Sequence, residues 1–276
     1  MQYWVDMKRR IRDSILKYGK SLKKLGSRIS PGFDAGDVHA FRTTAKKIKA
    51  LLHWQKIPKN SPGDSFVKLY HISGDLRNAQ LVLINFKESR RQHDGFILWL
   101  ANYIGQREQE FKEADHKKSF QKLYKKLSKL QVPGSGVKFL RTFFIHTILQ
   151  LEATVLMPNP TDEELHDLRK NIKDLQYVKQ WCKKNWVAGD KATRQISLLH
   201  LEKLSDLAGN YNDRRVALSL LTEYLEQEKN EQARKIALPM QKRMERQKAN
   251  LKTALLKSFS SFCKQVKTFK SATNTS

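Results

Sequence analysis

The sequence predicts an all-α protein in which two pseudo-symmetric four-helix-like bundles pack around a central basic groove. Three observations lead to this prediction. Apolar residues recur at helical spacing along most of the chain, Gly and Pro are sparse and cluster between the periodic segments, and one helical pattern occurs once in each half. Long helices joined by short loops are typical of up-and-down bundles.

The predicted helices follow one another along the chain. Two of them carry the repeated pattern and begin after Asp37 and Thr161, and the others cover residues 1–26, 66–92, 94–130, 137–157, 193–227 and 229–269. Asp37 is the expected N-cap of the first pattern helix, and Thr161 and Glu164 have the spacing of a capping box. Pro239 is expected to kink or break the last helix, because proline cannot donate a backbone hydrogen bond.

The clearest break lies at residues 132–136, which read Val-Pro-Gly-Ser-Gly. Clusters of Gly, Pro and Ser between periodic segments are typical of loops. We therefore expect a first helical repeat over residues 1–133 and a second over residues 134–276, packed together as one compact module.

The repeated pattern combines a buried stripe with a row of basic side chains. The apolar stripe positions, three or four residues apart, are Val38, Phe41, Ala45 and Ile48 in the first copy and Leu165, Leu168, Ile172 and Leu175 in the second. One residue after successive stripe positions come His39, Arg42 and Lys46, and in the second copy His166, Arg169 and Lys173. Each row lies beside a stripe that faces the core, so it is placed to line a cleft. Two such rows predict one shared site built by duplication.

A second repeated element follows each pattern helix. It places Gly74 before Arg77 and Asn78 in the first half, and Gly209 before Asn212 and Asp213 in the second. A glycine inside a helix usually has a packing reason, so both are expected to let the neighbouring pattern helix approach closely. The polar residues that follow would then reach the groove and orient its Arg and His side chains.

The composition favours a polyanionic partner. The chain has 53 Lys and Arg against 27 Asp and Glu, a formal net charge of +26 and a pI near 10.0. Charge of this size concerns partners and solubility rather than fold. No apolar run reaches the roughly 18–20 residues of a membrane span, and the first residues lack a signal-peptide core, so a cytoplasmic location is expected. Cys182 and Cys263 are expected to be free thiols.

Four elements, in this order, resemble the CHAD family, the conserved histidine α-helical domain, over residues 35 to 225. They supply His39, Arg42, Lys46, Lys47 and Lys49; then Gly74, Arg77 and Asn78; then His166, Arg169, Lys170, Lys173 and Tyr177; and then Gly209, Asn212 and Asp213. The resemblance implies a pseudo-two-fold helical fold whose basic groove binds inorganic polyphosphate without catalysis. The binding residues would be the His, Arg and Lys named here, with Asn78, Tyr177, Asn212 and Asp213 supporting them. The resemblance also implies a location at polyphosphate granules and a triphosphate-tunnel enzyme as a partner.

The chain departs from the family pattern in its cations. Lys46, Lys47 and Lys49 replace the usual arginines, Asn78 replaces an Asp, and Gln176 replaces a basic residue. Lysine keeps the charge but lacks the planar fork that binds phosphate through two hydrogen bonds.

Several other functions compete with polyphosphate binding. A single histidine in a first helical turn usually has a local partner, but two histidines, each followed by Arg and Lys at helical spacing, favour a ligand site. Tyr177 and Trp181 are expected to pack rather than to stack on bases. A groove of Arg and Lys without carboxylates should hold phosphate and not cut it, so no enzyme activity, metal or cofactor is expected. Non-specific binding of nucleic acid or another polyanion, or of acidic proteins, remains the alternative.

Overall fold

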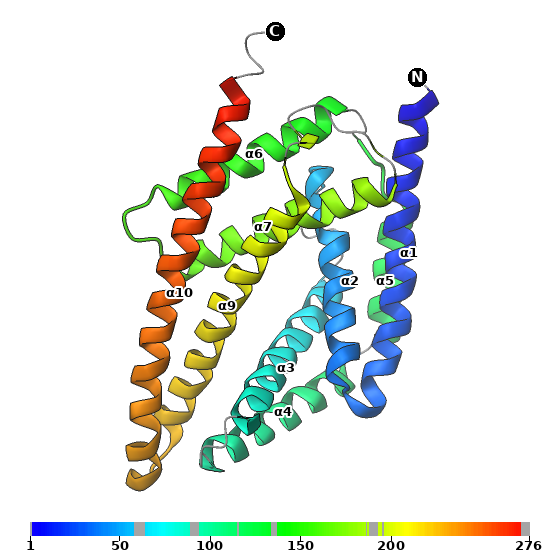
Figure 1. Cartoon of the computed structure of the whole chain (residues 1–276). Coiled ribbons are helices and arrows are strands. Elements are labelled where there is room, and N and C mark those ends of the chain that lie inside the picture. The colour runs from blue at the N-terminus through cyan, green and yellow to red at the C-terminus, as the bar shows by residue number, and fades with distance from the viewer. Residues whose placement is uncertain are drawn as a thin grey trace.

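The computed structural model describes residues 2–57, 64–88, 94–114, 116–133, 137–185, 187, 193–194 and 196–271. Its elements are α1 (Gln2–Gly32), α2 (Ala35–Trp54), α3 (Asp64–Glu88), α4 (Asp94–Glu113), α5 (His116–Ser128), α6 (Val137–Val155), α7 (Asp162–Lys184), α9 (Leu198–Gln227) and α10 (Glu231–Ser271) (Figure 1). Within these residues no strand occurs, which confirms the all-α class. Residues 134–136, at the predicted boundary between the halves, lie outside the described residues.

The helices of each half pack mainly on their sequence neighbours, and a few helix pairs join the halves. In the first half, α1 packs on α2 and α5, and α3 packs on α2 and α4. In the second half, α7 packs on α6 and α9, and α9 lies beside α10 as an antiparallel pair (Figure 1). The contacts between α2 and α7, between α3 and α9 and between α4 and α9 cross from one half to the other. The two helices that carry the repeated pattern, α2 and α7, therefore touch each other directly.

One hydrophobic core runs through both halves. All eight stripe positions of the repeated pattern are buried within it, as the spacing predicted. The rings of Trp54 on α2 and Trp181 on α7 lie 5.5 Å apart and join the halves at the centre of this core. A second, smaller cluster of buried residues lies between α3, α4, α9 and α10. Both cysteines are free and buried within the larger core.

The single helix expected over residues 94–130 is wrong, because the chain breaks into α4 and α5. Phe111 on α4 and Phe120 on α5 both contact Phe41, with ring centroids 6.4 Å and 6.2 Å from it. In one straight helix these two residues would be about 14 Å apart along the axis. The break lets both rings pack on the same buried partner.

The expected N-cap of α2 is wrong, and of the kink or break expected at Pro239 the break does not occur. The N-cap of α2 is Asp34, not Asp37: the Asp34 carboxylate accepts a hydrogen bond from the backbone N–H of Asp37 at 3.0 Å. Pro239 does not break α10, which continues through it. The carbonyl that loses its donor belongs to Lys235, and both residues are exposed, so water can reach this carbonyl.

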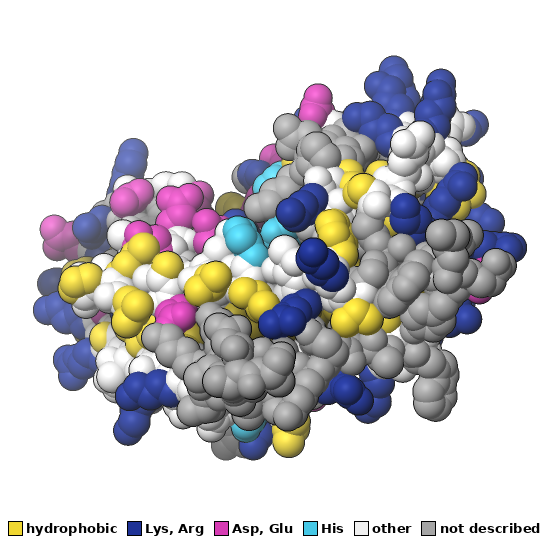
Figure 2. All heavy atoms as spheres, turned by 90° about the horizontal axis from the view of Figure 1, so that it is seen from above, with side chains coloured by type: hydrophobic (Ala, Val, Ile, Leu, Met, Phe, Trp, Pro, Cys, Tyr) yellow, Lys and Arg dark blue, Asp and Glu magenta, His cyan; other side chains and the backbone are white. Residues whose placement is uncertain are grey.

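The surface of the molecule mixes charge with exposed hydrophobic side chains. None of the described helices combines the length and the hydropathy that a bilayer crossing requires. Helix α6 runs across the upper part of Figure 1 and exposes Leu149, and Leu156 is exposed just after the helix ends. Figure 2, which looks down on this side, shows hydrophobic side chains in a band and Lys and Arg side chains mainly around its edge. Much of the positive charge therefore lies outside any single groove.

Candidate functional site

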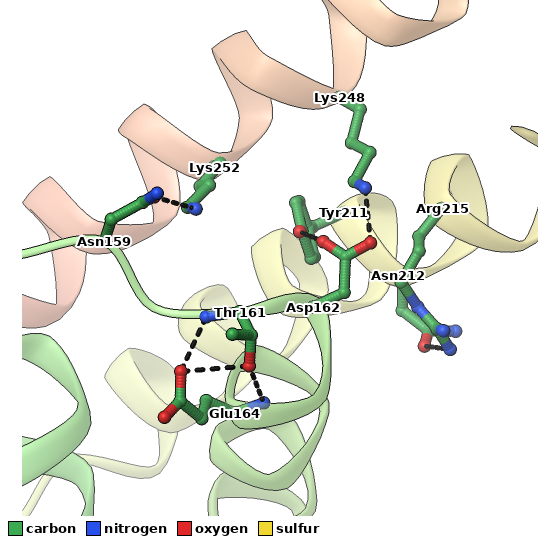
Figure 3. Close-up of polar contacts among 9 residues, drawn as sticks. All are labelled: Asn159, Thr161, Asp162, Glu164, Tyr211, Asn212, Arg215, Lys248 and Lys252. Atoms are coloured by element: carbon green, nitrogen blue, oxygen red, sulfur yellow. Dashed lines mark hydrogen bonds and ion pairs between the residues drawn. The ribbon is translucent and has the colours of Figure 1, made fainter. Parts of the chain in front are cut away.

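The N-terminus of α7 is fixed by its own capping residues and by two neighbouring helices. Thr161 and Glu164 form the predicted capping box: the Glu164 carboxylate accepts from the backbone N–H of Thr161 at 2.6 Å, and the Thr161 hydroxyl accepts from the backbone N–H of Glu164 at 3.3 Å (Figure 3). The carboxylate of Asp162 accepts hydrogen bonds from Tyr211 on α9 and Lys248 on α10. Burial opposes the charge of Asp162, but the hydrogen bonds from Lys248 and Tyr211 outweigh it and lower its pKa.

Three helices bring five positively charged side chains into electrostatic contact. They are Arg42 and Lys46 on α2, Arg77 on α3, and Arg169 and Lys173 on α7, and we call them the cation cluster. All five come from the basic positions that the sequence singled out. The repeated register of stripe and basic row brings them together, because the stripes of α2 and α7 pack into the same core.

Lys46 lies deepest in the electrostatic field of the cation cluster. Burial lowers its pKa to about 7, and the charges of Arg169, Arg42 and Lys173 act in the same direction. The carboxylate of Asp213 on α9 opposes this shift but does not cancel it. Within the part of the chain that the structure describes, no carboxylate forms an ion pair with this amine. A second negative charge from a ligand would therefore be favourable at this position.

Arg42 is held against α3 by a backbone carbonyl and an aromatic ring of that helix. Its guanidinium donates a hydrogen bond to the carbonyl of Tyr70 at 2.7 Å and lies 4.7 Å from the centre of that residue's ring. A Cβ atom at Gly74 would lie 2.5 Å from the Arg42 Nη1, so glycine is needed there for this close approach. The expectation for Gly74 is thus confirmed. The same expectation for Gly209 is wrong, since a Cβ atom there would meet nothing within 4 Å.

Several donors of the cation cluster remain available to a ligand. The Nε atoms of Arg77 and Arg169 are buried and have no hydrogen-bond partner among the described residues. Lys173 donates a hydrogen bond of 3.3 Å to the side-chain oxygen of Gln176, which is neutral. Buried guanidinium donors without acceptors are costly, and the oxygens of an anion would satisfy them.

Carboxylates lie around the cation cluster: Asp34 interacts electrostatically with Arg77, and Asp206 and Glu202 interact with Lys173. Asp213 is exposed on α9 and interacts electrostatically with Lys46, Arg77 and Lys173. Asp75 on α3 interacts in the same way with Arg42. The expectation of a groove without carboxylates is therefore wrong in detail. Asp213 had been expected to support the site, and its interactions with three cluster residues fit a role in holding them in place.

The two histidines occupy different environments. His39 is exposed and lies 3.4 Å from the hydroxyl of Thr43, and burial together with the charges of Arg77 and Lys46 lowers its pKa. His166 is half-buried, and its Nδ1 lies 3.2 Å from the Oδ1 of Asn212. Burial and the nearby charges of Lys170 and Arg215 lower the pKa of His166 to about 4. Both rings are therefore neutral at pH 7 and supply hydrogen bonds rather than charge.

Arg215 is a site residue that the sequence analysis missed. Its Nη2 donates to the Oδ1 of Asn212 at 3.3 Å, which identifies that oxygen as the acceptor for His166 as well. The Nδ1 of His166 therefore carries the proton, and its Nε2 is free to accept one. The signal for Arg215 was its position three residues after Asn212, one helical turn further along α9.

The remaining predicted site residues lie outside the cation cluster. Lys47 lies beside Tyr18 in a separate hollow, Lys49 lies 3.7 Å from the ring centre of Tyr70, and exposed Lys170 pairs with Asp167 at 2.7 Å. Asn78 is half-buried on α3.

The two aromatic residues predicted to pack do so. Trp181 is buried in the shared core, and Tyr177 is half-buried against the same core. Burial raises the pKa of Tyr177 to about 12, so its hydroxyl stays protonated near neutral pH. Across the described residues, no three or more His, Cys, Asp or Glu side chains are grouped as a metal site would require.

Comparisons with known proteins agree with this architecture. The crystal structure of the CHAD domain from the plant Ricinus communis is similar to this chain, with a TM-score of 0.67 and 17% sequence identity, over 90% of this chain and 91% of that chain. At this identity the similarity shows the fold alone. A search of curated proteins finds no match. The sequence pattern of the CHAD domain matches residues 30–222, which is more than half of the chain and includes α2, α3, α7 and most of α9. The chain therefore belongs to the CHAD domain family.

Proposed function

We propose that the cation cluster binds inorganic polyphosphate and that the chain does not catalyse a reaction on it. The observation that supports this proposal most directly is the convergence of Arg42, Lys46, Arg77, Arg169 and Lys173 from three helices. Like charges placed this close repel one another, and burial increases the cost because water screens them less. A ligand with one negative charge on every phosphate would relieve that repulsion along the whole cluster.

The chemistry of the cluster favours holding phosphate over cleaving it. Guanidinium and ammonium groups donate charge-assisted hydrogen bonds to phosphate oxygens, but they repel a divalent metal ion. The neutral His166 is oriented by Asn212, so it accepts a hydrogen bond from a protonated ligand or takes up a proton beside an anion. A cytoplasmic location, polyphosphate granules included, and a triphosphate-tunnel enzyme as partner stay predictions from the family resemblance.

A matched pair of charge variants tests the proposal. In one variant, Arg42→Gln and Arg169→Gln remove two charges from the cluster; in the other, Lys125→Gln and Lys126→Gln remove two exposed charges from α5. Each lowers the formal net charge of +26 by the same amount. Charge-assisted hydrogen bonds contribute roughly 1.5–3 kcal/mol each, so the cluster variant should bind polyphosphate about 10²–10⁴-fold more weakly. The surface variant should change the dissociation constant by less than about fivefold.

A competition experiment distinguishes polyphosphate from nucleic acid, the alternative ligand. Long-chain polyphosphate and single-stranded DNA are compared as competitors at equal phosphate concentration and physiological salt. Polyphosphate should displace DNA, because the cluster offers phosphate-binding cations and no stacking platform. Circular dichroism and melting curves that match those of the wild type control for unfolding. Equal losses in both charge variants would contradict the proposal and favour diffuse attraction to any polyanion.

A further inference from the structure

A second site lies next to the cation cluster but uses other residues. Helices α3, α9 and α10 line an open hollow of about 680 Å³. None of the five residues of the cation cluster lines it. Asp213 lines the hollow and also interacts with Lys46, Arg77 and Lys173, so it stands between the two sites. Small-molecule sites commonly have volumes of about 300–1,000 Å³, a range that includes this hollow.

One part of the hollow is apolar and adaptable. Met240 and Leu251 on α10 are partly exposed and line it. Val82 and Phe86 on α3, Ala217 on α9 and Met244 on α10 form its base and are buried in the smaller core cluster. Methionine thioethers pack well against flat aromatic surfaces, because sulfur is polarisable and the side chain is flexible. A chain of inorganic phosphate would leave this surface unused, so the lining favours a ligand with a flat organic group.

Carboxamide side chains supply the hydrogen bonds that such a group needs. Asn85 on α3, Asn210 on α9 and Gln247 on α10 all line the hollow. Each carboxamide offers both donors and an acceptor. Nucleobases carry donors and acceptors side by side on their edges, which matches this set better than a hydrocarbon chain would.

Two arginines give the hollow a positive charge of its own. Arg214 on α9 and Arg243 on α10 both line it. Burial lowers the pKa of Arg214, and the charge of Arg243 acts in the same direction, so the two guanidinium groups lie close enough to repel each other. Asp213 is the carboxylate in this lining, and its charge is shared with the cation cluster. Two adjacent guanidinium forks are suited to bind a diphosphate.

We propose that this hollow binds a nucleoside diphosphate or triphosphate. The base lies against Met240 and Leu251 and is recognised by the three carboxamides, while Arg214 and Arg243 bind the phosphates. The proposal does not rest on polyphosphate binding, because the two sites share no cation. The chain thereby has one site for a phosphate polymer and an adjoining one for a nucleotide.

Isothermal titration calorimetry of the full chain with ADP, adenosine and pyrophosphate tests the proposal. The ADP and pyrophosphate affinities are compared in the Arg42→Gln with Arg169→Gln variant, because its weakened cation cluster no longer competes with the hollow for pyrophosphate. ADP should bind at least tenfold more tightly than adenosine or pyrophosphate, because it alone uses both the apolar surface and the arginines. The Arg214→Gln and Arg243→Gln double variant should lose at least 30-fold in ADP affinity and change polyphosphate affinity less than threefold. Lys242→Gln with Arg246→Gln is the matched control: it removes two exposed charges from the same helix, outside the hollow, and should leave ADP binding unchanged.

A variant that fills the hollow keeps the test independent of charge. Asn210→Trp on the exposed side of α9 should abolish ADP binding without changing pyrophosphate binding. Equal affinities for ADP and pyrophosphate would overturn the proposal, because the apolar lining would then contribute nothing. Loss of ADP binding in Arg42→Gln with Arg169→Gln, but not in Arg214→Gln with Arg243→Gln, would overturn it by placing the nucleotide on the cation cluster. Binding of single-stranded RNA through Arg214 and Arg243 without ADP binding would also overturn it.

Discussion

Lys46 links ligand binding to pH. In the free protein its pKa is lowered to about 7 by burial and by the charges of Arg169, Arg42 and Lys173. A bound polyanion adds negative charge beside the amine and raises this pKa again. Above about pH 7 the free amine is partly neutral, so binding takes up a proton and affinity must fall as pH rises. Below about pH 6 the amine is protonated in both states, and this dependence disappears.

We therefore expect polyphosphate affinity to fall between pH 7 and 9, by up to about tenfold per pH unit. Fluorescence anisotropy with labelled polyphosphate at constant ionic strength measures it. The Lys46→Arg variant should flatten the profile, because a guanidinium stays charged over this range. His39 and His166 are neutral in the free protein because their pKa values are lowered. Any proton that they take up beside the polyanion remains in the Lys46→Arg variant, so the difference between the two profiles isolates Lys46. Identical pH profiles for the variant and the wild type would refute the assignment to Lys46.

Gly74→Ala should weaken binding by displacing a neighbour rather than by unfolding the chain. The new Cβ atom would lie 2.5 Å from the Nη1 of Arg42, at the end of a flexible side chain that can move away. The helix gains roughly 0.5–1 kcal/mol from the replacement of glycine, which offsets the lost contact to Tyr70. We expect a melting temperature within a few degrees of the wild type and a polyphosphate affinity at least tenfold lower. Gly105→Ala on α4, where a Cβ atom meets nothing within 4 Å, is the control that should bind normally.

At the scale of helices, Asp162 joins α7 to α9 and α10. Asp162→Asn keeps the shape of the side chain but removes the charge that pairs with Lys248. Because the pair is partly exposed, the expected loss is about 1–2 kcal/mol of unfolding free energy at pH 7. The folded-state pKa of Asp162 is lowered, so this stabilisation is present above the pKa of the unfolded chain and disappears as pH falls through the folded one. Urea denaturation at pH 7 and at pH 3 should show the difference shrinking; an unchanged difference would exclude the charge as its cause.

The sequence predicted the stripe helices well, because their burial follows directly from local spacing. It could not locate the break between α4 and α5, since that break depends on Phe111 and Phe120 meeting Phe41 from a distant part of the chain. It also could not separate Lys46 from Lys47. Neighbouring residues on a helix point about 100° apart, so Lys46 joins the cation cluster while Lys47 lies beside Tyr18.

The pseudo-repeat predicted the packing of the helices better than it predicted the contacts of individual side chains. It brought Arg42 and Arg169 into one cluster, yet only Gly74 of the two motif glycines has a side chain packed over it. Duplicated halves keep their helix packing, because the core requires it, while polar side chains around the groove can differ. Arg215 was missed for the same reason, since nothing at the matching place in the first half points to it.

For the whole molecule, the salt dependence of the binding affinity depends on the number of phosphates that the cation cluster neutralises. Five cations acting on a single-stranded polyanion predict a slope of roughly −3 to −4 in log affinity against log salt. The Arg42→Gln and Arg169→Gln variant should have a slope shallower by about 1–2. Titrations between low and physiological salt measure both slopes. A slope near zero, or equal slopes in the two proteins, would contradict binding through the cation cluster.

The core that both halves share has a consequence for how the chain is made. Trp54 is covered by Trp181, which is synthesised about 130 residues later. At about 5–20 residues per second, a ribosome needs roughly 6–25 s to make that distance. During this time the part of α2 that packs on α7 has no partner and is open to other nascent chains and to chaperones, while α1 and α3 cover the rest. The same duplication that assembles the binding site thus delays its folding until the second copy leaves the ribosome.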